Sequence, residues 1–280
     1  MDPFVFLAVM AAAALHASWN ALIKGGQDPY LSMTYMATMS GTLALLLLPF
    51  VQMPVPQAWV WLAASAALHT AYRYFLIEAY KAGDLVQVYP IARGAAPLMT
   101  AASTALLIGE TLSPFGYAGI GALVVGVFLM SLRGGRLGHL EPRAVGYALM
   151  TSLTITAYTF VDGVGARING SPQSFWAWMT CFNGLTMVAT AMLWRGPAVL
   201  SGFRKAWVPA VGGSVMSMAA YGIAIWAMTK APIALVAALR ETSVLFAALI
   251  SVLILKEPMT RWRTLAAAGI VGGIVLLRLA

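Results

Sequence analysis

Charged residues are scarce in this chain of 280 residues. Only 9% of them are Asp, Glu, Lys or Arg, whereas 61% are hydrophobic. Soluble domains have about 25% charged residues and about half apolar ones, so this composition excludes an ordinary soluble domain. A membrane-spanning helix needs about 20 apolar residues, and ten such spans would leave only short connectors. The composition therefore predicts an integral membrane protein.

Acidic residues and cysteine are scarcer still. The 9 Asp and Glu face 17 Lys and Arg, and the basic residues lie mainly in short connectors, which is typical of contact with anionic lipid rather than with nucleic acid. The single cysteine, Cys181, excludes an internal disulfide framework and a cysteine-cluster metal site. No HExxH, GxSxG or Walker motif is present. We expect no enzymatic activity, cofactor or metal, and an intramembrane enzyme is the least favoured alternative.

Ten apolar runs can be separated at Gly, Pro and charged residues. Their residue ranges are 4–22, 30–50, 58–79, 85–107, 115–132, 145–164, 173–194, 207–228, 232–254 and 263–279. Backbone polar groups in hydrocarbon need internal partners, and these runs are too long and too continuous for barrel strands. We therefore predict an all-α polytopic membrane protein with ten transmembrane helices. The first run is expected to be retained, because a basic n-region does not precede it.

An internal repeat relates the two halves of the chain. Arg93 and Glu110 are separated by 17 residues, as are Arg240 and Glu257. We predict a first five-helix repeat over 1–134, a polar connector over 135–144 and a second repeat over 145–280. Because five is odd, the second repeat enters the membrane from the opposite face. Such 5+5 inverted topology is typical of secondary transporters with a midplane binding site and alternating access.

The segments that carry this repeat resemble a known transporter family. They run from Pro90 through Pro97 to Thr111, and from Ala237 to Pro258. They are similar to the ten-helix EamA branch of the drug/metabolite transporter superfamily, and within it to YddG-type exporters of aromatic amino acids. The resemblance implies export of amino acids and related metabolites across a bacterial inner membrane. The second copy has Ala237 and Val244 in place of Pro90 and Pro97, so we expect the two halves to bend differently.

The main rival function is a flippase for a lipid-linked sugar or another lipid carrier of the same superfamily. Transport without ATP is expected in either case, because no nucleotide motif exists. Small-molecule substrates and membrane lipids are the expected partners, and the sequence leaves the oligomeric state open, a monomer included. The sequence leaves open whether export is proton-coupled, through His16, His69 and Asp162, or facilitated.

Ionisable groups inside spans are costly, so each is a candidate for the binding site. Arg93 and Arg240 occupy matching places in the repeat and are predicted to hold a substrate carboxylate. Alternatively, Arg240 pairs with the adjacent Glu241, or both arginines extend to the interface. Glu110 and Glu257 lie at span ends, where a plain terminal charge is the favoured interpretation.

The third span carries a polar stripe. His69, Tyr72, Arg73, Leu76 and Tyr80 follow helical spacing on one face, which predicts the lining of a wet cavity or, alternatively, a structural hydrogen-bond network. The full set of predicted substrate-binding residues is His16, Trp19, Asn20, His69, Tyr72, Arg73, Tyr80, Tyr89, Arg93, Tyr158, Asp162, Tyr221, Trp226, Arg240 and Glu241.

Two further patterns concern packing and orientation. Ala122 and Gly126 match Gly269 and Gly273, and such small residues let helices approach closely. Eleven of the 17 basic residues lie in the odd-numbered connectors. The positive-inside rule then places these connectors in the cytoplasm and both termini in the periplasm, although members of the resembled family are often drawn the other way.

Overall fold

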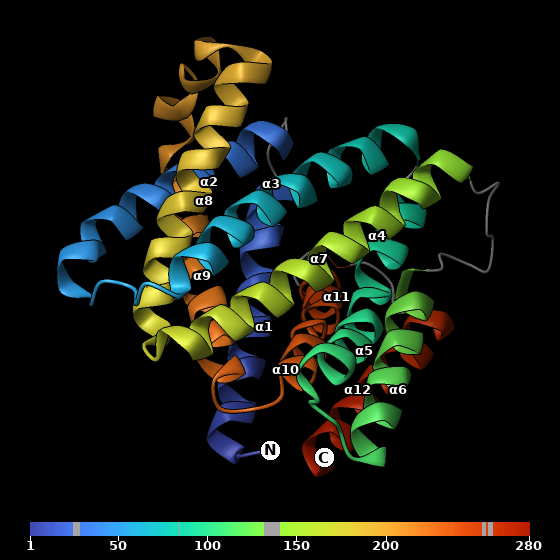
Figure 1. Ribbon diagram of the computed structural model, residues 1–280. Coiled ribbons are helices and arrows are strands. Elements are labelled where there is room, and N and C mark those ends of the chain that lie inside the picture. The colour runs from blue at the N-terminus through green and yellow to red at the C-terminus, as the bar shows by residue number, and fades with distance from the viewer. Residues whose placement is uncertain (25–28, 84, 132–140, 254–255, 257–259) are drawn as a thin grey trace.

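The computed structural model describes residues 1–24, 29–83, 85–131, 141–253, 256 and 260–280, and over these ranges it is helical without strands (Figure 1). The α-helices are α1 (Pro3–Lys24), α2 (Pro29–Leu47), α3 (Ala58–Ala82), α4 (Leu85–Gly94), α5 (Ala96–Ile108), α6 (Pro114–Ser131), α7 (Pro142–Asn169), α8 (Pro172–Arg195), α9 (Phe203–Met228), α10 (Ile233–Arg240), α11 (Ser243–Leu253) and α12 (Arg261–Leu279). Two short 3₁₀ helices, η1 (Leu48–Phe50) and η2 (Pro197–Leu200), follow α2 and α8.

The helix boundaries follow local signals in the sequence. Proline stands at the start of α6, α7 and α8, where its missing N–H costs nothing. Gly109 and Gly170 end α5 and α7 in the left-handed conformation, with φ of 67° and 71°. Seven helical stretches in the described ranges are long and apolar enough to cross a membrane, and two of them, Ile91–Ile108 and Ile233–Leu253, each combine residues of two successive α-helices. The chain is therefore a multi-pass membrane protein.

Two of the expected spans are interrupted near their middle. The run 85–107 forms α4 and α5, which part at Ala95, and the run 232–254 forms α10 and α11, which part at Glu241 and Thr242. Pro97 lies in the first turn of α5. The second break has no proline. Instead, the amides of Glu241 and Thr242 bond three residues back, and the Thr242 hydroxyl donates to the carbonyl of Leu239 at 2.6 Å.

The two breaks lie at matching places of the repeat but differ in their local structure. Arg93 immediately precedes Gly94 at the end of α4, and Arg240 ends α10. Each arginine therefore lies at the break of its own span. The tightened turn at Glu241 and Thr242 replaces the proline of the first copy, because bonds to the third residue back also end an α-helix.

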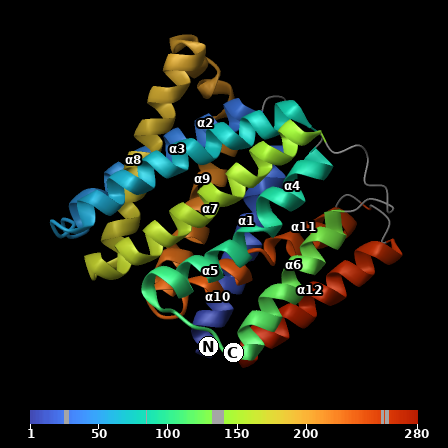
Figure 2. The same cartoon turned by 45° about the vertical axis from the view of Figure 1, so that its right-hand side comes forward.

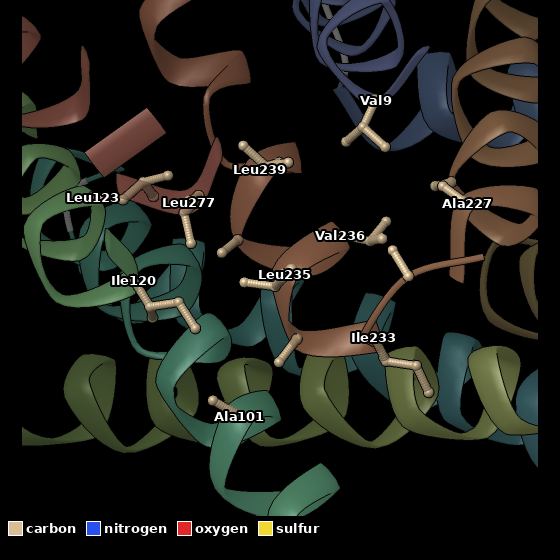
Figure 3. Packing of buried hydrophobic residues seen from close by; sticks show 14 of the residues in the cluster. Val9, Ala101, Ile120, Leu123, Ala227, Ile233, Leu235, Val236, Leu239 and Leu277 are labelled. Atoms are coloured by element: carbon tan, nitrogen blue, oxygen red, sulfur yellow. The ribbon is translucent and has the colours of Figure 1, made fainter. Parts of the chain in front are cut away.

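The largest apolar core surrounds α10. The side chains from Ile233 to Leu239 are all buried. Val9 from α1, Ala101 from α5, Ile120 from α6 and Ala227 from α9 belong to the same cluster, which encloses α10 from several sides (Figure 3). A helix that is apolar all round is expected to be enclosed in this way.

The remaining helices pack in pairs. Helix α3 lies along α7, α1 along α9, α2 along α8 and α6 along α12. Both views place α6 and α12 on one side of the bundle and α2 and α8 on the other (Figures 1 and 2). The two termini lie together, and Arg278 Nη1 donates to the carbonyl oxygen of Met1 at 2.7 Å.

Helices α6 and α12 touch through their glycines. A Cβ placed on Gly126 would lie 2.8 Å from the backbone nitrogen of Ile270, and one on Gly273 would lie 2.8 Å from that of Leu123. No side chain fits at either point. The small-residue faces predicted from Gly126 and Gly273 therefore meet each other.

Candidate functional site: a cavity among the broken helices

A cavity of about 270 Å³ lies between helices of both halves of the chain. Eight helices contribute to its wall. The lining residues are His16, Trp19, Asn20, Met33, Met36, Ala37, Ser40, His69, Tyr72, Arg73, Leu76, Tyr80, Ala92, Arg93, Thr151, Ile155, Tyr158, Trp176, Met179, Thr180, Asn183, Gly184, Ser217, Met218, Tyr221 and Arg240.

The polar stripe of α3 faces this cavity. All five of its members, His69, Tyr72, Arg73, Leu76 and Tyr80, are among the lining residues. They run from the middle of α3 toward Lys81, and Tyr80 is 39% exposed. Helical spacing alone thus brings five side chains of α3 to one wall.

Arg93 lies at the end of α4, and its guanidinium already contacts two protein side chains. Its Nε is 3.3 Å from Glu241 Oε2, and both side chains are buried. Its Nη2 donates to His16 Nε2 at 3.0 Å. A guanidinium can only donate, so this contact assigns the neutral ring to His16, with its proton on Nδ1. The carboxylate of Glu241 therefore pairs with Arg93 rather than with its neighbour Arg240.

Arg240 lies over an aromatic ring. Its guanidinium carbon is 4.8 Å from the centre of the Tyr221 ring, a cation–π geometry. Arg240 forms no ion pair with any residue that the structure describes. Neither alternative predicted for Arg240, pairing with Glu241 or extension to the interface, is seen.

Asp162 lies behind the cavity wall rather than on it. It is fully buried, and its Oδ2 accepts a 2.5 Å hydrogen bond from the Tyr221 hydroxyl and lies 3.0 Å from His69 Nε2. The His69 ring stacks on Tyr158 at 4.2 Å, and Tyr72 meets Tyr158 edge-on at 5.7 Å. Asp162 thus orients two rings that face the cavity, which is the network predicted as an alternative for this stripe.

Several polar atoms of the wall are buried without a hydrogen-bond partner among the described residues. They are the indole nitrogens of Trp19 and Trp176, Nη1 of Arg73 and Oδ1 of Asn183. Three of these four groups are donors. Among these four groups, hydrogen-bond donors without a partner therefore outnumber acceptors without one.

Four predicted residues are not on the cavity wall as described. Besides Asp162, Glu241 faces a smaller neighbouring cavity beside Arg93. Trp226 packs against the core and meets Phe4 edge-on at 5.7 Å. Tyr89 lies in α4, and its side chain is outside the described part of the chain. The other eleven predicted residues line the cavity.

The contributions of α2 and α8 were not predicted. Trp176, Thr180 and Asn183 follow i, i+4, i+7 on α8, and they line the cavity together. Their helical spacing, in a run with few polar residues, was the sequence pattern that could have indicated a cavity-facing side of α8. Met33 and Met36 of α2 carry no comparable signal, because methionine is equally at home in an apolar core.

The opposite side of the bundle is closed by an ionic contact. Glu110 follows α5, and its Oε1 accepts from Arg167 Nη2 at 2.9 Å while its Oε2 accepts from the amide of Ile233, the first residue of α10, at 2.8 Å. Arg167 also donates to the carbonyls of Met228 and Ala231. Glu110 is therefore a bridge between helices and more than the terminal charge that was expected. Glu257, its counterpart in the repeat, lies outside the described residues.

Within the ranges that the structure describes, no group of three His, Cys, Asp or Glu side chains is placed to hold a metal ion.

Comparisons with known proteins agree with this architecture. The sequence model of the EamA-like transporter family matches residues 3–132 and 142–279. A solved crystal structure is similar over 99% of this chain and 96% of that one, with a TM-score of 0.76 and 20% identity, a likeness that concerns the fold alone. No curated protein matches the chain significantly.

Proposed function

Because the chain belongs to the EamA-like transporter family, we propose that it exports amino acids and related small metabolites across a bacterial inner membrane by alternating access, without ATP. The observation that carries this proposal is the cavity, with its three arginines and aromatic wall. Charge suits a carboxylate head group, and rings supply apolar area for side chains. The narrower likeness to YddG-type exporters stays a prediction.

The pairing of helices supports a 5+5 inverted repeat with ten spans. In such a repeat, α1 corresponds to α7, α2 to α8, α3 to α9 and α6 to α12. The contact between α1 and α9 then matches the contact between α7 and α3. The α2–α8 and α6–α12 contacts each join a helix to its own counterpart in the other half. The two segments matched by the family, 3–132 and 142–279, also support the predicted repeats 1–134 and 145–280.

Access from one side only supports alternating access. The cavity residues of α3 run from its middle toward Lys81, and those of α1 lie in its second half, toward Lys24. The cavity therefore reaches toward the end of the bundle that carries these basic residues. At the other end, the Glu110–Arg167 contact and the core around α10 separate it from solvent. By the positive-inside rule, this is a cytoplasm-open state.

Flux measurements on purified protein in liposomes test the function. We expect radiolabelled amino acids to cross down their gradient without ATP, and Arg240→Ala to lower this flux. Empty liposomes and liposomes with Arg143→Gln, an exposed arginine outside the cavity, are the controls. If lipid-linked sugars cross and amino acids do not, the proposal is wrong and the flippase alternative holds.

A further inference from the structure

The charged side chains of the cavity wall all have the same sign. Arg73, Arg93 and Arg240 line it, and no Asp or Glu does so among the residues that the structure describes. A zwitterionic amino acid brings an ammonium group as well as a carboxylate. This wall has guanidinium groups for the carboxylate and no carboxylate for the ammonium.

Two of these arginines have no acidic partner among the residues that the structure describes. Arg93 is neutralised by Glu241 at 3.3 Å. Neither Arg73 nor Arg240 makes an ion pair with any described residue, and Nη1 of Arg73 is buried without a hydrogen-bond partner. Both side chains are partly buried, where a charge is less well solvated than in open water, so a ligand that supplies two negative groups would compensate both.

Unmet hydrogen-bonding capacity gives a second, independent indication. The buried indole N–H groups of Trp19 and Trp176 find no acceptor among the described residues, and both line the cavity. Indole nitrogens only donate. A ligand rich in acceptor oxygens would satisfy them together with Arg73, whereas an ammonium group would satisfy none of the three.

The two unpaired arginines lie at different depths. Arg240 lies over Tyr221 at the break between α10 and α11, and the Tyr221 ring is 5.9 Å from that of His69. On α3, Arg73 is four residues beyond His69, which is about 6 Å along the helix axis at 1.5 Å per residue. Aromatic side chains, Tyr72 and Tyr158 among them, lie in this part of the wall. The spacing favours two anionic groups on one apolar body rather than one compact anion.

We propose, resting on the transport function above, that the preferred substrates within this class are organic dianions. Their two carboxylates are carried on an aromatic or aliphatic body, one for Arg240 and one for Arg73, with the tryptophan N–H groups completing the shell of donors. Zwitterionic amino acids without an acidic side chain are then carried too, but they bind more weakly than such dianions.

Three probes that share a phenyl ring test this inference. Phenylsuccinate has two carboxylates, 3-phenylpropionate has one, and phenylalanine has one together with an ammonium group. Binding to the detergent-purified protein is followed by tryptophan fluorescence, since Trp19 and Trp176 line the cavity. We expect phenylsuccinate to bind about tenfold more tightly than phenylpropionate, as one added charge-assisted contact warrants, and phenylalanine to bind most weakly. Equal or tighter binding of phenylalanine overturns the inference.

A substitution at Arg73 locates the second carboxylate. Arg73→Gln should weaken phenylsuccinate binding about tenfold and leave phenylpropionate unchanged, while Arg143→Gln should change neither. Loss of affinity for both probes in equal measure contradicts the assignment of Arg73. If Arg73→Gln does not fold, the order of the three probes on the native protein still decides.

Flux separates this inference from the proposed function. If phenylalanine crosses liposomes as fast as phenylsuccinate, transport stands and the dianion preference falls. If phenylsuccinate binds in the expected order but no probe crosses the membrane, the ligand class stands and the transport function falls.

Discussion

The carboxylate of Glu110 and the guanidinium of Arg167 lie 2.9 Å apart and join the segment after α5 to the last turn of α7. The other oxygen of Glu110 accepts from the first amide of α10, where a negative charge also suits the helix dipole. One side chain thus holds three segments together on the closed side of the cavity.

Removing the charge of Glu110 should destabilise the packing on the closed side of the cavity. Glu110→Gln should lower the free energy of unfolding by about 1 kcal/mol, because the ion pair is partly exposed. It should also speed maleimide labelling of an Ala237→Cys probe in a Cys181→Ala background, since Ala237 is buried beside the smaller cavity. Glu141→Gln, an exposed acid without a capping bond, is the matched control. Identical labelling rates in both variants would show that Glu110 does not restrain this side.

Arg93 and Arg240 should differ when they are truncated. Arg93→Ala leaves Glu241 buried without its partner and should lower the free energy of unfolding by about 3–5 kcal/mol. The double change Arg93→Ala and Glu241→Ala should regain most of this loss. Arg240→Ala should cost less stability, because no acidic partner is left behind.

In transport, both arginine variants should lose carboxylate substrates more than cationic amines. The comparison is made as flux per unit of folded protein. If Arg240→Ala carries carboxylates at the native rate, the carboxylate role is wrong.

The hydroxyl of Tyr221 should contribute more to stability than that of Tyr72. Tyr221→Phe removes the donor to buried Asp162, whose Oδ1 already lacks a hydrogen-bond partner, and should cost about 1–3 kcal/mol. Tyr72→Phe makes the same chemical change on the same cavity wall. Unfolding of both variants in detergent gives the comparison, and equal losses would argue against a structural role for the Asp162 cluster.

A methyl group should not fit between α6 and α12. Gly126→Ala places a Cβ 2.8 Å from the backbone of α12 and should cost about 1–3 kcal/mol through overpacking. Gly121→Ala, on the same helix, meets nothing within 4 Å and should be neutral or slightly stabilising, because Ala favours helix. Thermal unfolding distinguishes the two, and a neutral Gly126→Ala would mean that the helices separate easily.

Fusions to the C-terminus test orientation. The basic side chains of Lys81, Arg143 and Arg195 are exposed at ends of α3, α7 and α8, and the charge count predicts that those ends face the cytoplasm. The two termini, which lie together at the other end (Figure 1), are then periplasmic. A fluorescent-protein fusion that requires cytoplasmic folding should stay dark, and a phosphatase fusion that requires export should be active. The reverse pattern would show that the charge count fails here.

The sequence was informative wherever polar side chains interrupt an apolar background. His69, Tyr72 and Arg73 stand out because a charged or polar stripe does not face lipid, and the cavity was found through them. The small-residue match of Gly126 and Gly273 likewise predicted a close contact. The ends of α5, α6, α7 and α8 were predictable because Pro or Gly marks them, whereas the break at Glu241 and Thr242 carries neither residue.

Relations between distant residues were not predictable. The partner of Glu241 is Arg93 rather than the adjacent Arg240, because the break after α10 sets side-chain directions that helical spacing cannot anticipate. Asp162 was identified as polar, but its place behind the cavity depends on how α7 packs on α3 and α9. The bridge from Glu110 to Ile233 spans 123 residues and leaves no local pattern.

The backbone contact between α6 and α12 also limits how the molecule can deform. Two helices whose backbones meet at glycines, with Ile270 and Leu277 packed against Gly126 and Gly119, can swivel about the crossing point but cannot slide along each other without collision. A rocking of one half against the other is thereby confined to rotation about this edge of the bundle. Helices α2 and α8 lie on the far side of the bundle (Figure 2), away from the axis of this rotation. A rotation of a few degrees at the glycines would therefore displace the cavity wall that α2 and α8 provide further than any other part of it.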